Sequence, residues 1–165
     1  MKGIYAGSFD PPTKGHEWMI KQGAEMFNEL IIAIGVNPGK KYSFSAEERL
    51  EMLSEIAQNY PNVKITVLNN NYLVKYAHER GINYLLRGIR NEDDYKYEKQ
   101  MRNINDIIEP SCKTIFLMPP QNLGDISSSL VKSLIGPDDW EAVVKQYVPE
   151  TVYIRLLEKF ENGCK

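Results

Sequence analysis

Residues 3–16 read GIYAGSFDPPTKGH, and the change of pattern inside this stretch decides the predicted fold. Its first four residues form a short apolar run typical of a buried strand, whereas apolar residues after Gly15 recur at helical spacing. Between the two, Gly7 allows a sharp turn and the Pro11-Pro12 pair stiffens the chain. We therefore predict a strand, a turn and a helix whose positive end, with His16 in its first turn, faces the turn.

Short apolar runs alternate with helix-period segments along the rest of the chain. We predict strands over residues 3–6, 30–34, 63–68, 84–86 and 114–118, and helices after Gly15, from a capping box at Ser45, and over residues 73–80, 93–108, 127–135, 138–147 and 149–160. The expected buried faces are Ile20, Ala24 and Phe27 in the first helix, Leu50, Leu53 and Ala57 in the second, and Tyr97, Met101, Ile104 and Ile108 in the fourth. The alternation predicts an α/β fold: one domain over residues 1–165, with a doubly wound, parallel, five-stranded sheet and C-terminal helices.

The composition excludes several classes of protein. The chain has 165 residues and a formal net charge of −2, so no global positive field attracts a nucleic acid. No apolar run approaches the length of a membrane span, and the N-terminus shows no signal-peptide core. Cys112 and Cys164 lie far apart and form no metal-type pair. We expect a cytoplasmic protein without a nucleic-acid or membrane partner.

Four polar segments follow predicted strands: residues 7–16, 37–41, 87–90 and 121–129. In open α/β sheets, ligands bind beyond the carboxyl ends of the strands, so these segments should meet at one edge. Each segment carries groups that can bind phosphate. Their convergence indicates a phosphate ligand more strongly than any single motif does.

The first two segments carry one candidate side chain each. The imidazole of His16 can donate a hydrogen bond to a phosphate oxygen as charge builds up during a displacement, or it can merely cap the helix. Lys40, beside Lys41 after a Pro-Gly kink, can follow a moving phosphate, although exposed lysine pairs are usually only solvated. His78 lies in the middle of a predicted helix, and we interpret it as solvated.

The other two segments offer guanidinium and hydroxyl donors. Arg87 and Arg90 flank Gly88, where forked donors and a close backbone can hold phosphate; the alternative is two ordinary surface ion pairs. The serines at 127–129 lie at a predicted helix start, which suits an anion and equally suits an N-cap. Glu98 can reach a ribose hydroxyl, whereas most of the acids before it are interpreted as structural.

These motifs resemble a known superfamily. Residues 13–16, TKGH, are similar to the (Thr/His)-x-Gly-His signature of the nucleotidyltransferases, which have a Rossmann-like fold. The order of RGIR at residues 87–90, Tyr97-Glu98, Met118-Pro119 and ISSSLVK at residues 126–132 resembles the bacterial phosphopantetheine adenylyltransferases. The likeness covers nearly the whole chain, including its length.

The resemblance implies reversible transfer of AMP from ATP to 4′-phosphopantetheine, giving dephospho-coenzyme A and pyrophosphate, in coenzyme A biosynthesis. It also implies Mg²⁺ bound to ATP without dedicated protein ligands, a homohexamer, and dephospho-coenzyme A or coenzyme A as product or inhibitor. The implied catalytic residues are His16, Lys40 and Arg90. The residues implied to contact ATP are Ser8, Phe9, His16, Gly88, Ile89, Arg90, Glu98, Leu123, Gly124, Asp125, Ile126, Ser127, Ser128 and Ser129; those implied to hold phosphopantetheine are Ser8, Lys40, Leu73, Arg87 and Asn105.

Three positions depart from the family's pattern. Ser8 stands where threonine is usual, which keeps the hydroxyl and loses a methyl group. Leu123-Gly124-Asp125 replaces a commonly aromatic and serine-containing stretch, which alters the expected contacts to adenine. Ser133 replaces a frequent glutamate, and we expect that change to be structural.

The expected chemistry needs no general base, because a phosphate monoester is already ionised at neutral pH. The sequence shows no Ser-His-Asp arrangement, so we expect an in-line displacement without a covalent intermediate, which depends on alignment and charge neutralisation. Two alternatives stay open. One is transfer of a nucleotidyl group to another small phosphorylated metabolite, and the other is a non-catalytic nucleotide-binding sensor.

Overall fold

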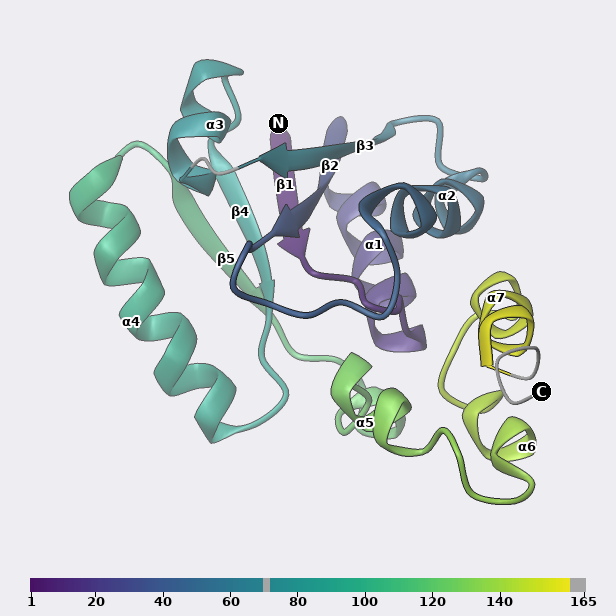
Figure 1. The fold of residues 1–165 in the computed structure, drawn as a ribbon. Helices are drawn as coiled ribbons and strands as arrows, with labels where there is room; N and C mark the ends of the chain where they lie inside the picture. Colours follow the sequence, from purple (N-terminus) through teal and green to yellow (C-terminus); the bar gives the residue numbers. More distant parts are fainter. Residues whose placement is uncertain (70–71, 161–165) are drawn as a thin grey trace.

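The computed structural model describes residues 1–69 and 72–160 and contains a five-stranded sheet (Figure 1). Every neighbouring pair of strands is parallel, and the order is β3-β2-β1-β4-β5. The strands are β1 (Lys2–Gly7), β2 (Glu29–Val36), β3 (Val63–Asn69), β4 (Tyr84–Gly88) and β5 (Lys113–Leu117). The predicted parallel sheet is confirmed, with strand ends that differ from the prediction by one or two residues; β5, for example, ends one residue before Met118.

Helices cover both faces of the sheet, as a doubly wound fold requires (Figure 1). One face carries α1 (Lys14–Met26) and α2 (Ala46–Ala57), and the other carries α3 (Leu73–Glu79) and α4 (Glu92–Ile108). Successive residues of a strand point to opposite faces, so Tyr5 packs in the core beneath α1 and α2 while Ile4 packs in the core beneath α3. Both cores are apolar, which explains why the strands have almost continuous hydrophobic sequences.

After β5 the chain continues as a 3₁₀ turn, η1 (Gln121–Leu123), and the helices α5 (Ser128–Ser133), α6 (Trp140–Val144) and α7 (Glu150–Phe160). The predicted helices over 127–135 and 138–147 are therefore too long. Gly136 has a φ of 121° and Pro137 follows it, and this pair separates α5 from α6. The segment returns to α1, where the Lys14 backbone N–H donates to the Tyr147 carbonyl over 2.9 Å.

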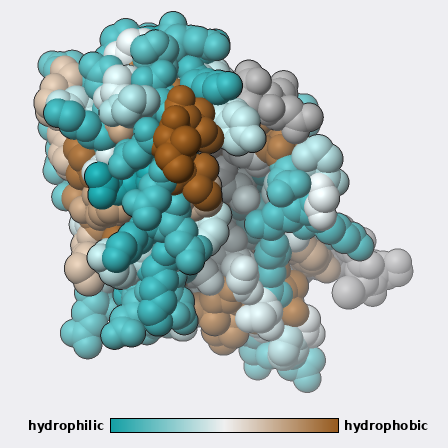
Figure 2. Space-filling model, turned by 90° about the vertical axis from the view of Figure 1, so that its left-hand side faces the viewer, coloured by the Kyte–Doolittle hydropathy of each residue, from teal (hydrophilic) through white to brown (hydrophobic). Residues whose placement is uncertain are grey.

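The predicted buried face of α4 is correct only in part, because Met101 and Ile108 are partly buried and Ile108 packs against the core beneath α3. Tyr97 and Ile104 are 57% and 47% exposed, and the buried residue of this helix is Glu98. The helix lies along the outer side of the sheet (Figure 1), and Figure 2 shows hydrophobic patches between polar side chains on this side of the molecule. An ion pair of Glu98, described below, also ties the helix to the sheet.

The predicted faces of α1 and α2 agree better with the structure. In α1, Ile20 is buried and Ala24 is partly buried, and Phe27, directly after the helix, is buried as well. In α2, the buried residues are Arg49, Met52, Leu53, Ile56 and Ala57, whereas Leu50 is only partly buried. The Ser45 capping box is confirmed, because the Ser45 side chain accepts from the Glu48 N–H and the Glu48 side chain accepts from the Ser45 N–H.

Cys112 is buried, and Cys164 lies outside the described residues. Across residues 1–69 and 72–160, none of the helices is long and apolar enough to cross a membrane.

The strand order reverses between β1 and β4. The loop after β1 leads to α1 on one face, and the loop after β4 leads to α4 on the other (Figure 1). Loops that diverge in this way leave a crevice at the carboxyl ends of the two strands, which is the usual ligand position in open α/β sheets.

Candidate active site

A cavity of about 340 Å³ opens at the carboxyl ends of β1 and β4. Its volume is in the range of ligand pockets, roughly 300–1,000 Å³. All four polar segments that the sequence singled out contribute to its wall. The predicted site residues that line it are Ser8, Phe9, His16, Lys40, Arg87, Gly88, Arg90, Glu98, Leu123, Ile126, Ser127, Ser128 and Ser129.

Five predicted site residues do not line the cavity: Leu73, Ile89, Asn105, Gly124 and Asp125. Ile89 is buried, and its N–H donates to the Leu117 carbonyl, which extends the pairing of β4 with β5. Leu73 begins α3, and the Asn105 carbonyl accepts the N–H that caps the end of α4. Four of these positions lie within or beside segments that line the cavity, whereas α3, which carries Leu73, contributes no lining residue.

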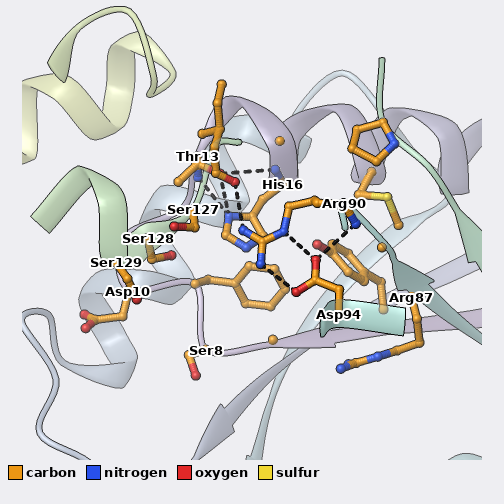
Figure 3. A pocket seen from close by; sticks show the side chains of 18 of the residues that line it. Ser8, Asp10, Thr13, His16, Arg87, Arg90, Asp94, Ser127, Ser128 and Ser129 are labelled. Atoms are coloured by element: carbon orange, nitrogen blue, oxygen red, sulfur yellow. Dashed lines mark hydrogen bonds and ion pairs between the residues drawn. The ribbon is translucent and has the colours of Figure 1, made fainter. Parts of the chain in front are cut away.

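His16 is the third residue of α1, and its ring takes part in a capping box with Thr13. The Thr13 backbone N–H donates to Nδ1 over 3.0 Å, and the Thr13 Oγ1 lies 3.0 Å from the same nitrogen (Figure 3). Because Nδ1 accepts a backbone hydrogen bond, the proton of the neutral imidazole resides on Nε2. Capping therefore uses one nitrogen and leaves the other as a donor.

Burial keeps the His16 imidazole neutral. Desolvation, and then the positive charge of Arg90, lower the pKa of His16 to about 4. The ring packs edge-on against Phe9, with centroids 5.0 Å apart. Phe9 itself is buried with a φ of 51°, a left-handed conformation that is uncommon for a bulky residue. The Phe9 ring thus helps to hold the neutral Nε2–H donor of His16 in a fixed orientation.

Arg90 is joined to Asp94 by several hydrogen bonds (Figure 3). Its Nε and Nη2 donate to the two carboxylate oxygens of Asp94 over 2.8 and 3.0 Å, and its Nη1 donates to the Ile126 carbonyl over 3.2 Å. The hydrogen bond from Arg90 lowers the pKa of Asp94, and the same bond raises the pKa of Arg90. Arg90 therefore joins the loop after β4 to the segment before α5 as a permanent cation.

Arg87 is held by Glu98 through two parallel hydrogen bonds, from Nε over 2.9 Å and from Nη2. Its Nη1 donates to the Ala6 carbonyl over 2.9 Å. Burial disfavours the charge of Arg87, but the hydrogen bond and charge of Glu98 outweigh it and raise the pKa of Arg87. Both Glu98 oxygens are engaged by this arginine, so the structure gives Glu98 a partner that sequence reasoning missed.

Lys40 brings the loop after β2 to the loop after β1. It is exposed, and its Nζ lies 3.4 Å from the Ser8 Oγ. Lys41 is exposed as well but does not line the cavity. The lysine at 40 is therefore the one of the pair that the fold brings to the site.

The serine run joins α5 to the first loop. Ser127 caps α5, because its Oγ accepts from the Leu130 N–H over 3.1 Å, as the N-cap interpretation predicted. The Ser128 hydroxyl donates to the Pro11 carbonyl over 2.8 Å. Ser129 is exposed at the cavity. Two of the three hydroxyls thus make hydrogen bonds within the protein: that of Ser127 to α5 and that of Ser128 to the first loop.

Sequence reasoning left several lining residues out of the site. Tyr5 and Met19 are apolar wall residues, and burial raises the pKa of the Tyr5 hydroxyl above its usual range. The polar ones are Asp10, Thr13, Asp94, Tyr97 and Lys132, and the rest are Ala6, Gly7, Gly15 and Pro119. A signal for three of the polar ones was present, because Asp10 and Thr13 lie inside the first motif and Lys132 ends the last one.

Comparisons with known proteins show which family this chain resembles in sequence. Residues 4–134 match the family model described as cytidylyltransferase-like. The phosphopantetheine adenylyltransferase of Chromobacterium violaceum is 47% identical over 161 residues, 98% of each chain. That of Caldanaerobacter subterraneus subsp. tengcongensis is 41% identical, covering 97% of this chain and 98% of the relative.

Solved structures support the fold. Plasmodium falciparum nicotinic acid mononucleotide adenylyltransferase complexed with NaAD superposes with a TM-score of 0.66 at 18% identity, over 95% of this chain and 94% of that one. A putative nicotinate-nucleotide adenylyltransferase from Vibrio parahaemolyticus gives a TM-score of 0.64 at 18% identity, over 95% and 91%.

Proposed function

This chain belongs to the cytidylyltransferase-like family and, within it, to the phosphopantetheine adenylyltransferases, and we propose that its cavity at β1 and β4 carries out their reaction. The protein transfers AMP from ATP to 4′-phosphopantetheine, reversibly, and forms dephospho-coenzyme A and pyrophosphate. The observation that carries this conclusion is the sequence identity, up to 47% over nearly the whole chain, with relatives named phosphopantetheine adenylyltransferase.

The reaction is a single displacement at phosphorus. An oxygen of the acceptor phosphate forms a bond to the α-phosphorus of ATP, the bond from that phosphorus to the β-bridging oxygen breaks, and pyrophosphate leaves with the electron pair. The acceptor is already an anion, so no proton has to be removed. What the protein must supply is alignment of two phosphates and compensation of the charge that develops on them.

We assign the acceptor phosphate to the side of the cavity with Ser8, Lys40 and Arg87. Lys40 and Ser8 lie within hydrogen-bonding distance of each other, and Glu98 and the Ala6 carbonyl fix the orientation of the Arg87 guanidinium. Leu73 and Asn105 stay predicted contacts of the pantetheine arm, and α4, which carries Asn105, contributes lining residues.

We assign ATP to the side with His16, Arg90 and the serine run. The Nε2–H of His16 donates to the phosphate oxygens as their charge grows, and it does so as a neutral group at physiological pH. Arg90 neutralises charge on the β- and γ-phosphates. The remaining proposed ATP contacts are Ser8, Phe9, Gly88, Ile89, Glu98, Leu123, Gly124, Asp125, Ile126, Ser127, Ser128 and Ser129.

We propose that Mg²⁺ enters this cavity on the phosphates of ATP. The three carboxylates that line the cavity are each paired with a cation: Asp10 with Lys132, Asp94 with Arg90 and Glu98 with Arg87. A carboxylate engaged in this way is a poor ligand for a metal ion, whereas phosphate oxygens and water suit Mg²⁺. When bound, the ion neutralises part of the negative charge of the triphosphate.

The homohexamer, the inhibition by coenzyme A and the cytoplasmic location stay predictions. Support for an assembly comes from α4, which exposes Tyr95, Tyr97, Ile104 and Ile107. Ile107 is 84% exposed, and large apolar side chains gathered on one surface helix are typical of protein–protein contacts. Native mass spectrometry measures the number of subunits directly.

The function is tested by one assay with purified protein, ATP, Mg²⁺ and 4′-phosphopantetheine. We expect dephospho-coenzyme A and pyrophosphate to form, and ATP to form when these two products are supplied instead. CTP in place of ATP, and mononucleotides in place of 4′-phosphopantetheine, serve as controls for the related transferases. Faster turnover with one of those substrates, or ATP binding without any turnover, would contradict the proposed reaction.

A further inference from the structure

Asp10 is almost completely buried, with 1% of its surface exposed, and its carboxylate is surrounded by donors. The Ser43 N–H lies 3.0 Å from both of its oxygens, and the Phe44 N–H donates to Oδ1 over 2.8 Å. The Lys132 Nζ donates to Oδ2 over 3.0 Å. A buried charge is tolerated only when it is paired in this way. These contacts therefore tie the first loop, which carries Asp10, to the loop that carries Lys40 and to α5.

The first constraint acts on the loop that carries Lys40. Asp10 fixes the end of this loop at Ser43 and Phe44. The beginning is fixed at Asn37, whose N–H donates to the Tyr42 hydroxyl over 2.8 Å. Lys40 lies between the two fixed points, so a change at Asp10 moves the lysine that faces Ser8.

The second constraint acts on Lys132 near the end of α5. Its side chain is 30% exposed and lines the cavity, on the same segment as Ser129. A lysine ammonium has three N–H donors, and Asp10 takes one of them. The pairing therefore holds the Nζ at one point of the cavity wall while donors remain for a phosphate.

We propose that Asp10 is a positioning residue that fixes Lys40 and Lys132 relative to each other, so that the acceptor phosphate and the ATP phosphates are aligned in one cavity. Asp10 acts through these two lysines. Its carboxylate oxygens accept hydrogen bonds from the Ser43 and Phe44 amides and from the Lys132 ammonium. This inference rests on the proposed function for the identity of the two phosphates.

The test uses Asp10→Asn, Lys132→Gln and the double variant. Asparagine keeps the size of the side chain but has one acceptor oxygen and places an NH₂ group against donors. Glu29→Gln is the matched control, because Glu29 pairs with Lys64 over 3.0 Å at the opposite end of the sheet. For each protein, kcat, the KM for each substrate, the melting temperature, and the calorimetric Kd for ATP and for the acceptor, phosphopantetheine, are measured.

For Asp10→Asn we expect the KM and the Kd to rise for both substrates, by about tenfold for the acceptor, with a lower kcat, as for the loss of a charged hydrogen bond. Lys132→Gln should raise the KM and Kd for ATP and lower kcat, and it should leave the acceptor Kd unchanged. In the double variant, Asp10→Asn should still raise the KM and Kd for the acceptor, but it should not raise those for ATP beyond the values of Lys132→Gln alone. Glu29→Gln should behave as wild type.

Unchanged affinities in folded Asp10→Asn would overturn the proposal, as would additive effects of the two substitutions on ATP. A lower melting temperature with unaltered KM values would mean a merely structural role and would overturn it too. If Asp10→Asn does not fold, Lys132→Gln tests the proposal, because this substitution keeps the contacts of Asp10 with the Ser43 and Phe44 amides. An unchanged Kd for ATP in Lys132→Gln would then refute the proposal. Wild-type protein without turnover would instead refute the proposed function, since the binding measurements report on Asp10 independently.

Discussion

The two nitrogens of His16 have separate tasks. Nδ1 accepts from the Thr13 N–H, which fixes both the tautomer and the orientation of the ring. Nε2 is left as a neutral donor toward the cavity, and the low pKa of about 4 ensures that it stays neutral over the physiological range. The capping and functional interpretations of this residue are therefore compatible, because the cap prepares the donor.

His16→Ala should lower turnover far more than it weakens ATP binding. The hydrogen bond from Nε2 strengthens as charge develops on phosphate, so its loss should lower kcat by about 10²–10³. Steady-state kinetics give kcat, and calorimetry gives the Kd for ATP. His78→Ala is the control, because His78 is exposed on α3, away from the cavity. Near-normal turnover of His16→Ala would remove this residue from the mechanism.

Lys40→Ala should raise the KM for the acceptor, phosphopantetheine, by about tenfold or more and should also slow the chemical step, because a point charge at the acceptor phosphate is lost. The neighbouring Lys41→Ala is the matched control, since Lys41 is outside the cavity wall. Both variants are compared by initial rates at saturating ATP. An acceptor KM that responds equally to the two substitutions would place Lys40 outside the site.

Single residues also show where sequence reasoning reached its limit. The phosphate-binding candidates His16, Lys40, Arg87 and Arg90 were predicted because motif and position after a strand agreed, and they all line one cavity. Asp10 was missed as a site residue because its partners are 33 to 122 positions away in the sequence. No local pattern reports a contact over such a separation.

At the scale of elements, the strands and α1 were predictable because their periods are regular and their buried faces are apolar. The face of α4 was predictable only in part, since the helix is also tied to β4 by the ion pair of Glu98 with Arg87 and leaves Tyr97 and Ile104 exposed. A period calculated from hydrophobicity ignores ion pairs. It also marks apolar residues as buried whether they face a core or the surface of the molecule.

The contact between β1 and the end of α1 gives a prediction on stability. A Cβ atom at Gly3 would lie 2.5 Å from the Phe27 Cε2, and Phe27 is itself buried. Gly3→Ala should therefore lower the free energy of unfolding by about 1–3 kcal/mol through overpacking. Gly35→Ala is the matched control in the neighbouring strand, because the nearest atom to its Cβ lies at 3.7 Å. Urea denaturation measures both, and equal effects would contradict the packing argument.

At the scale of the whole molecule, charged side chains are buried close to the candidate active site. Arg87, Glu98, Asp10 and Arg49 are charged, and the last three are buried. Arg49 donates to the Ser8 carbonyl over 2.8 Å, so even this cation outside the cavity wall supports the first loop. Beside these groups lies His16, whose pKa is lowered by desolvation and by Arg90, so its protonation makes the stability of the fold depend on pH.

The contribution of His16 to this dependence has a definite sign. The folded protein keeps His16 neutral down to about pH 4, whereas the unfolded chain protonates it near its ordinary pKa of 6.5. The unfolded state binds more protons in this interval, so the stabilisation is complete above pH 6.5 and is lost as the pH falls toward 4. At pH 5 the loss should be about 2 kcal/mol relative to pH 8.

The comparison that isolates this effect is wild type against His16→Asn, because the asparagine Oδ1 can replace Nδ1 as the acceptor for the Thr13 N–H but does not titrate. Urea denaturation at several pH values between 4 and 8 gives the free energy of unfolding of both proteins. All other titrating groups are shared, so their contributions cancel in the difference. We expect the stability of wild type relative to the variant to decrease steadily as the pH is lowered from 6.5. A difference that is independent of pH would mean that the folded protein does not hold His16 neutral, and the neutral-donor role in catalysis would fail with it.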